Sequence, residues 1–131
     1  MEIIEEPRLL ICNKMKTPDG TILESHFIHE AVYHTDKNGK KYMTDGGIAY
    51  LHRTNNGDEV DLSVYSDDSH NKIRENLTWG SYGKSGKEKF KWILLKDMTT
   101  EHIRAVIETQ YNIYPQVKRA MMNELTYRSE K

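Results

Sequence analysis

The chain has 131 residues, which is the size of one domain and too short for two independent hydrophobic cores. Apolar residues make up 37% and charged residues 30%, a balance that indicates a thin core or association between subunits. The 19 Lys and Arg against 20 Asp and Glu give a net charge of -1, which argues against general binding to nucleic-acid polymers or anionic membranes.

The N-terminal segment carries Glu2, Glu5 and Glu6 where a signal peptide has a basic stretch followed by an apolar run. The longest apolar run near either end, Leu9 to Cys12, is far below the roughly 20 residues of a membrane helix. These features predict a soluble protein without an export signal. The single cysteine, Cys12, is expected to be a buried and inert thiol in a reducing cytoplasm.

The first half of the chain, residues 8–65, has the pattern of an antiparallel meander. Each predicted strand is rich in β-branched and aromatic residues. The predicted strands cover residues 8–16, 21–35, 41–44, 48–53 and 60–65. Turn sequences follow the first two strands, Thr17-Pro18-Asp19-Gly20 and Asp36-Lys37-Asn38-Gly39.

The second half predicts mainly helices. Residues 66–97 are expected to form a short helix, a Gly-rich loop over residues 80–87 and a strand over residues 88–96. Residues 99–128 predict two helices, because apolar side chains there repeat with helical spacing and Pro115 suits the first turn of the second helix. The sequence therefore predicts one α+β domain over residues 1–131, with an N-terminal antiparallel sheet followed by two C-terminal α-helices.

Residues that could carry chemistry are scattered. His26 and His29 would lie on opposite faces of a strand, which argues against a shared metal ion. A phosphate-binding loop at Gly83-Lys84-Ser85 fails, because the required earlier glycine is replaced by Thr78. We expect no catalytic residue, metal or cofactor. Trp79 and the residues after it suit either a local nucleotide site or a hairpin connection with Trp79 in the core.

A series of short motifs runs through most of the chain in a defined order. The motifs are Asp19-Gly20-Thr21, His29-Glu30, Asp36 to Gly39, Asp45-Gly46-Gly47, Tyr50-Leu51-His52-Arg53, Asp61 to Tyr65, Trp79 to Lys84, Leu95-Lys96-Asp97, His102-Ile103 and Thr109-Gln110. In this order they resemble the phage proteins that counter Thoeris defence by sequestering its cyclic ADP-ribose-type messenger. That family favours consecutive arginines after the Tyr-Leu pair, where this chain has His52 and Arg53.

The resemblance implies a phage anti-defence protein that acts in the host cytoplasm as a sponge. Such proteins have an N-terminal antiparallel sheet and two C-terminal helices, and form dimers that assemble to hexamers. They bind glycocyclic ADP-ribose in pockets between subunits without cleaving it. Some members also hold cyclic oligonucleotides of the CBASS system at separate pockets.

The resemblance and the side-chain chemistry together suggest a set of ligand-binding residues. An aromatic side chain is expected to stack on the base, basic side chains to contact phosphate or ribose, and an amide to orient an edge of the ligand. The stacking candidates are Trp79 and Tyr82, the basic candidates are Arg74, Lys84 and Arg119, the amide is Gln110, and His29 and Arg53 lie in matching motifs.

Two other functions stay open at this point. One is a cyclic-nucleotide phosphodiesterase with His26, His29 or His102 as acid and base. The other is an inhibitor that binds a host defence protein directly through a sheet edge or the terminal helices.

Overall fold

The longest described strand, β1 (Leu10–Lys16), is central to the computed structural model, which describes residues 8–83 and 86–130. This strand pairs antiparallel with β2 (Ile22–Ser25) on one side and with β6 (Val60–Asp61) and β7 (Val64–Tyr65) on the other. A tight turn joins β1 to β2 where the sequence predicts one, because the Gly20 N–H donates to the Thr17 carbonyl at 2.9 Å.

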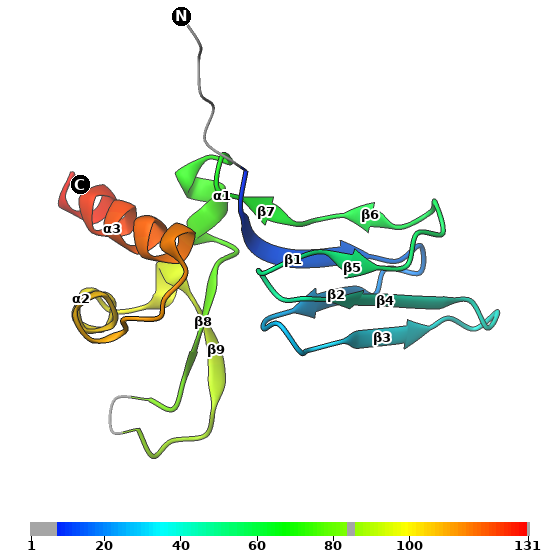
Figure 1. Ribbon diagram of the computed structural model, residues 1–131, viewed down its shortest axis with the longest axis horizontal. Helices are drawn as coiled ribbons and strands as arrows, with labels where there is room; N and C mark the ends of the chain where they lie inside the picture. Colours follow the sequence, from blue (N-terminus) through cyan, green and yellow to red (C-terminus); the bar gives the residue numbers. More distant parts are fainter. Residues whose placement is uncertain (1–7, 84–85, 131) are drawn as a thin grey trace, which may run out of the picture.

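A second sheet contains β3 (Val32–Thr35), β4 (Lys41–Asp45) and β5 (His52–Arg53) in that order. The prediction of one continuous meander is wrong, because the predicted strand over residues 21–35 is interrupted by a loop and β2 does not pair with β3. The last extended segment returns to β1 and does not continue from β5. The N-terminal half is therefore two small antiparallel sheets (Figure 1).

The β1 strand contributes to two apolar clusters. Met15 packs with Leu23 and Tyr42 in a small cluster that joins the two sheets. Ile11 and Cys12, at the other end of the strand, belong to the main core. The chain thus buries two clusters that share one strand, which is how a chain with few apolar residues supports both sheets and helices.

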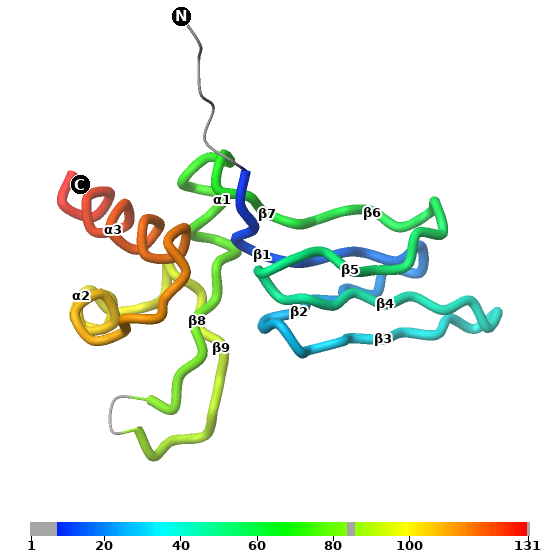
Figure 2. The backbone as a smooth tube through the Cα atoms, in the orientation of Figure 1, coloured from blue at the N-terminus to red at the C-terminus, as the bar shows by residue number. Residues whose placement is uncertain are grey.

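The rest of the chain begins with α1 (His70–Arg74), followed by the hairpin of β8 (Thr78–Ser81) and β9 (Lys91–Leu94). The prediction that a loop starts at residue 80 is wrong, because pairing with β9 extends the strand through Ser81. A 3₁₀ turn, η1 (Leu95–Asp97), ends the predicted last strand early. Figure 2 traces this path from the sheets through α1 and the hairpin to the C-terminal helices.

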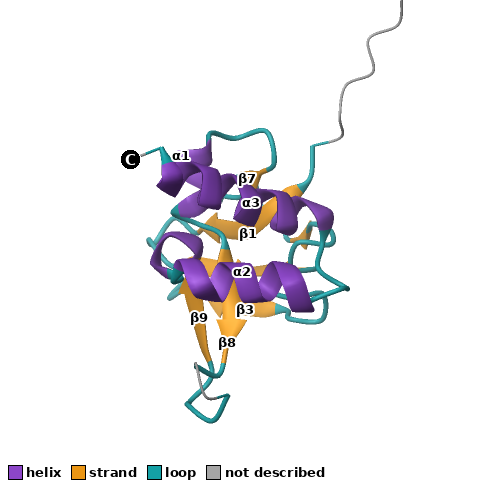
Figure 3. Ribbon diagram, turned by 90° about the vertical axis from the view of Figure 1, so that its left-hand side faces the viewer, coloured by secondary structure: helices purple, strands orange, loops and turns teal. Residues whose placement is uncertain are grey.

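The two predicted terminal helices are α2 (Thr100–Thr109) and α3 (Pro115–Ser129), which lie side by side (Figure 3). Thr99 caps α2 by accepting a hydrogen bond from the His102 N–H at 3.0 Å. Pro115 stands in the first turn of α3, as predicted. No helix among the described residues has the length and apolar character needed to cross a membrane.

The main core lies where α2 and α3 meet the hairpin and the end of β1. Most of the apolar positions predicted for both helices are buried there, whereas Ile107, Leu125 and Trp79 are partly buried and pack against this core. Its fully or nearly fully buried members are Ile11, Cys12, Val64, Ile73, Leu77, Leu95, Met98, Ile103, Val106, Val117, Ala120 and Met121. Figure 1 shows the hairpin between the helices and the two sheets, so three structural units meet beside it.

Candidate functional site

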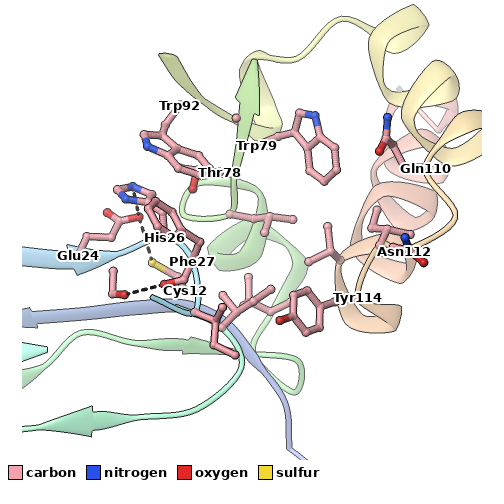
Figure 4. A pocket seen from close by; sticks show the side chains of 18 of the residues that line it. Cys12, Glu24, His26, Phe27, Thr78, Trp79, Trp92, Gln110, Asn112 and Tyr114 are labelled. Atoms are coloured by element: carbon pink, nitrogen blue, oxygen red, sulfur yellow. Dashed lines mark hydrogen bonds and ion pairs between the residues drawn. The ribbon is translucent and has the colours of Figure 1, made fainter. Parts of the chain in front are cut away.

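A cavity of about 430 Å³ opens where the hairpin, the N-terminal sheet and the segment between α2 and α3 meet. Its volume falls within the range of small-molecule sites. Aromatic side chains form much of its wall, and we call it the aromatic cavity after Phe27, Trp79, Phe90, Trp92 and Tyr114 (Figure 4).

The hairpin supplies three of these rings around one glycine. Gly80 lies opposite Trp92 in the β8–β9 register, and the rings of Phe90 and Trp92 cover its Cα. A Cβ atom at Gly80 would lie 2.7 Å from the Phe90 ring and 3.1 Å from the Trp92 ring. Phe90 meets Trp92 edge to face at 5.2 Å. Gly80 is therefore required by close packing of aromatic rings.

Glu24 and His26 line the sheet side of the cavity and belong to an ion cluster that extends behind its wall. The ring of His26 stacks on Trp92 with centroids 4.3 Å apart and an interplanar angle of 11°. Its Nε2 lies 3.2 Å from Glu24 Oε2, and its Nδ1 lies 3.0 Å from Glu30 Oε1. Lys14 Nζ approaches the other oxygen of Glu24 at 3.8 Å. Both ring nitrogens of His26 thus face carboxylates.

These contacts set the charges of the cluster. Burial would lower the pKa of His26, but the hydrogen bonds and charges of Glu24 and Glu30 outweigh burial and raise this pKa above its usual value. Burial would raise the pKa of Glu24, but His26 and Lys14 outweigh it and lower this pKa. An imidazolium that donates to two carboxylates has no ring nitrogen left to accept a proton.

Cys12 lies on the floor of the same cavity and is buried, as predicted. Burial and the neighbouring charge of Glu24 raise the pKa of its thiol to about 12. The thiol donates to Glu24 Oε2 at 3.7 Å. Because the thiolate is the nucleophilic form, Cys12 is held in its unreactive state.

Two of the predicted ligand-binding residues meet at this cavity. Trp79 comes from β8 and Gln110 from the residue that ends α2, and both line the cavity wall. Figure 4 shows the indole of Trp79 and the amide of Gln110 facing each other, with His26, Phe27 and Trp92 on the sheet side. Helix packing brings Gln110 to the hairpin.

The other stacking candidate and its neighbours lie elsewhere. Tyr82 is 58% exposed, does not line the cavity, and packs on Phe90 with ring centroids 5.0 Å apart. His29 is exposed in the loop after β2 and also lies outside the cavity wall. Lys84 lies outside the described residues. Arg119 lines a second cavity, of about 610 Å³, beside the start of α3.

Two predicted arginines make contacts within the protein. Arg74 binds Glu124 through two hydrogen bonds of 2.8 and 2.9 Å. Arg53 donates to Asp61 at 3.0 Å and to Asn13 at 2.6 Å, and so ties β5 to β1 and β6. Both guanidinium groups thus bind oxygen atoms of neighbouring residues in this structure, and neither residue lines the aromatic cavity.

Several cavity residues were missed from the sequence as ligand contacts. The alternation of Phe90 and Trp92 with polar residues indicated one strand face, but not what covers it. Phe27 and Tyr114 stand in a loop and at the start of a helix, where no periodic signal marks a binding role. Among the described residues, no group of three or more His, Cys, Asp or Glu side chains is arranged to hold a metal ion.

Comparison with protein-family models, curated proteins and solved structures finds no match to this chain.

Proposed function

We propose that this protein binds a cyclic nucleotide messenger of the ADP-ribose type and sequesters it intact. The observation that supports this proposal is the meeting of Trp79 and Gln110 at one cavity of about 430 Å³. The indole offers a flat face for an adenine base, and such stacking contributes about 1–3 kcal/mol per base. The Gln110 amide can both donate and accept a hydrogen bond at an edge of the ligand.

The chemistry of the cavity wall favours retention over cleavage. Of the three histidines considered as acid and base, His26 lines the cavity, whereas His29 and His102 do not. Both ring nitrogens of His26 already face carboxylates, and the Cys12 thiol is held protonated. A phosphodiesterase that used His26 or Cys12 would need a ring nitrogen free to accept a proton or a thiolate able to attack phosphorus.

The diphosphate of such a ligand needs positive charge from beyond the cavity wall. The described residues that line the aromatic cavity include no Lys or Arg. Phe27, Ile28, Phe90 and Tyr114 line it and are each 40–50% exposed, which leaves apolar surface at its mouth. In this proposal a second copy of the chain covers that surface and supplies cations, in agreement with the expected dimers and hexamers.

The first test is sequestration of glycocyclic ADP-ribose by the purified protein. The mixture is filtered, the retained protein is heat-denatured, and both fractions are chromatographed. We expect the intact messenger to leave the filtrate and to return on heating. Recovery of a linear product would instead indicate a phosphodiesterase. A messenger that stays in the filtrate would contradict the proposal and leave direct binding to a defence protein as the alternative.

Replacement of Trp79 tests the stacking contact. Trp79→Leu keeps apolar bulk against the main core but removes the flat ring, so we expect the messenger to bind about 5- to 150-fold more weakly in calorimetric titration. Tyr82→Ala is the matched aromatic control and should change affinity less than twofold, because Tyr82 lies outside the cavity. Equal losses in both variants would contradict this placement of the base.

A charged substitution at the cavity mouth tests whether a second copy of the chain binds there. Ile28→Glu places a carboxylate on the apolar rim, and we expect it to reduce the molar mass measured by light scattering to that of a monomer. Val60→Glu is the control, since Val60 is similarly exposed on β6 and does not line the cavity. An unchanged mass for Ile28→Glu would place any subunit interface elsewhere.

A further inference from the structure

The main-chain groups of β8 alternate in direction along the hairpin. The Leu95 N–H donates to the Leu77 carbonyl at 2.8 Å, and these residues stand opposite each other when the β8–β9 register is extended by one pair. Hydrogen-bonded pairs recur at every second position of an antiparallel ladder. Trp79 and Ser81 therefore bond to β9, whereas the N–H and C=O groups of Thr78 and Gly80 point away from it.

The side of β8 that carries these outward groups has no strand beside it. Within residues 8–83 and 86–130, β8 pairs with β9 alone. Outside the strand ladders, no backbone or side-chain hydrogen bond joins the main-chain groups of Thr78 or Gly80 to another described residue. Both residues are partly buried and line the aromatic cavity. Outward amides and carbonyls on a cavity wall bind water or a ligand, so a ligand in the cavity can take up these hydrogen bonds.

We propose that the outward amide and carbonyl groups of Thr78 and Gly80 recognise the edge of the adenine base that stacks on Trp79. This inference rests on the proposed function and names the part of the ligand that the site reads. One residue of an edge strand presents a donor beside an acceptor. Adenine presents the complementary pair, because its N6 amino group donates and a neighbouring ring nitrogen accepts.

The shape of the site favours a base over a peptide strand as the occupant. β8 has four residues, of which Thr78 and Gly80 alone carry outward groups on the cavity wall. The cavity, of about 430 Å³, is bounded by the indole of Trp79 on one side and by the His26–Trp92 stack on the other (Figure 4). This space suits a flat ring system with one polar edge toward β8.

The ligand arm of the test compares glycocyclic ADP-ribose with its 1,N6-etheno derivative, prepared with chloroacetaldehyde, on the unmodified protein. The etheno bridge removes the N6 donor and blocks N1 while keeping a flat base. We expect at least about tenfold weaker binding of the derivative in calorimetric titration, from the loss of two hydrogen bonds. Equal affinities would overturn this inference but leave sequestration standing. No binding of the unmodified messenger would overturn the proposed function itself.

A substitution in the protein shows whether the etheno derivative binds weakly because hydrogen bonds are lost or because the added bridge is too large for the site. Thr78→Pro removes an N–H that carries no ladder bond, and edge strands tolerate proline at such positions. We expect Thr78→Pro to weaken messenger binding about 2- to 12-fold. We also expect it to reduce the difference in affinity between the messenger and its etheno derivative. If the difference in affinity between the messenger and its etheno derivative is the same for Thr78→Pro as for the native protein, the inference is overturned. If this variant does not fold, amide NMR of the native protein decides. Messenger should shift the Thr78 and Gly80 amide protons downfield, and unmoved signals would overturn the inference.

Discussion

Glu124→Gln is expected to lower the free energy of unfolding by about 3–5 kcal/mol at pH 7, because it removes the negative charge of a buried ion cluster. Glu124 is fully buried on α3 and accepts hydrogen bonds from two arginines and one histidine. Arg74 binds it through two hydrogen bonds, Arg128 through one at 2.8 Å, and His70 through one at 2.9 Å. Glutamine keeps the shape but leaves two guanidinium groups without a counter-charge.

The same cluster makes stability depend on pH. Burial of Glu124 opposes its ionisation, but Arg74, Arg128 and His70 outweigh burial and lower its pKa from 4.5 to about 2. A lowered pKa means that the unfolded state binds more protons, so this stabilisation is present above about pH 4.5 and is lost as pH falls toward 2. We expect urea denaturation of the native protein to show this loss, and Glu124→Gln to lack it.

Glu108→Gln is the matched control for charge removal on the helices. Glu108 is exposed on α2, so its replacement should change the free energy of unfolding by less than about 0.5 kcal/mol. Equal effects of the two substitutions would contradict the structural role assigned to Glu124. The same pair of variants tests whether Arg74 has a structural role, because its ion pair with the buried Glu124 holds the Arg74 side chain in place.

Gly47→Ala should destabilise the fold by about 2–5 kcal/mol, the second large effect that we expect. Gly47 has φ +53°, and a left-handed conformation costs about 1–2 kcal/mol for a residue with a side chain. Its Cβ atom would also lie 2.5 Å from the carbonyl carbon of Phe27, and overpacking of this kind costs about 1–3 kcal/mol. Urea denaturation measures the sum.

Gly47→Ala should also affect the aromatic cavity, because Phe27 in the loop after β2 lines the cavity wall. The Gly47 N–H donates to Ser25 Oγ at 2.9 Å, and its carbonyl accepts from Asn13 Nδ2 at 2.9 Å. A displaced Phe27 backbone would therefore alter the cavity wall, and we expect weaker messenger binding by the folded fraction of Gly47→Ala. Gly20→Ala is the control, because Gly20 has φ +91° and nothing lies within 4 Å of its Cβ position. Equal destabilisation by both variants would show that packing against Phe27 contributes nothing.

Local sequence determined the elements whose hydrogen bonds close over a few residues. The Thr17–Gly20 turn, the Thr99 cap and the Pro115 start each depend on side-chain or backbone geometry within one turn of chain. The apolar positions of α2 and α3 were also predictable, because helical spacing alone selects the face that must be buried. The sequence also indicated Trp79 and Gln110 as ligand-binding residues, and both line the aromatic cavity.

Tertiary structure decided which strands pair and which side chains meet. The return of residues 60–65 to β1 depends on loop paths and shared burial, which local propensity does not encode. The carboxylate partners of Arg53 and Arg74 were not predictable for the same reason, because they lie on other elements. The sequence does not show whether an arginine binds a phosphate or a buried glutamate. Only the folded chain shows which partner it has.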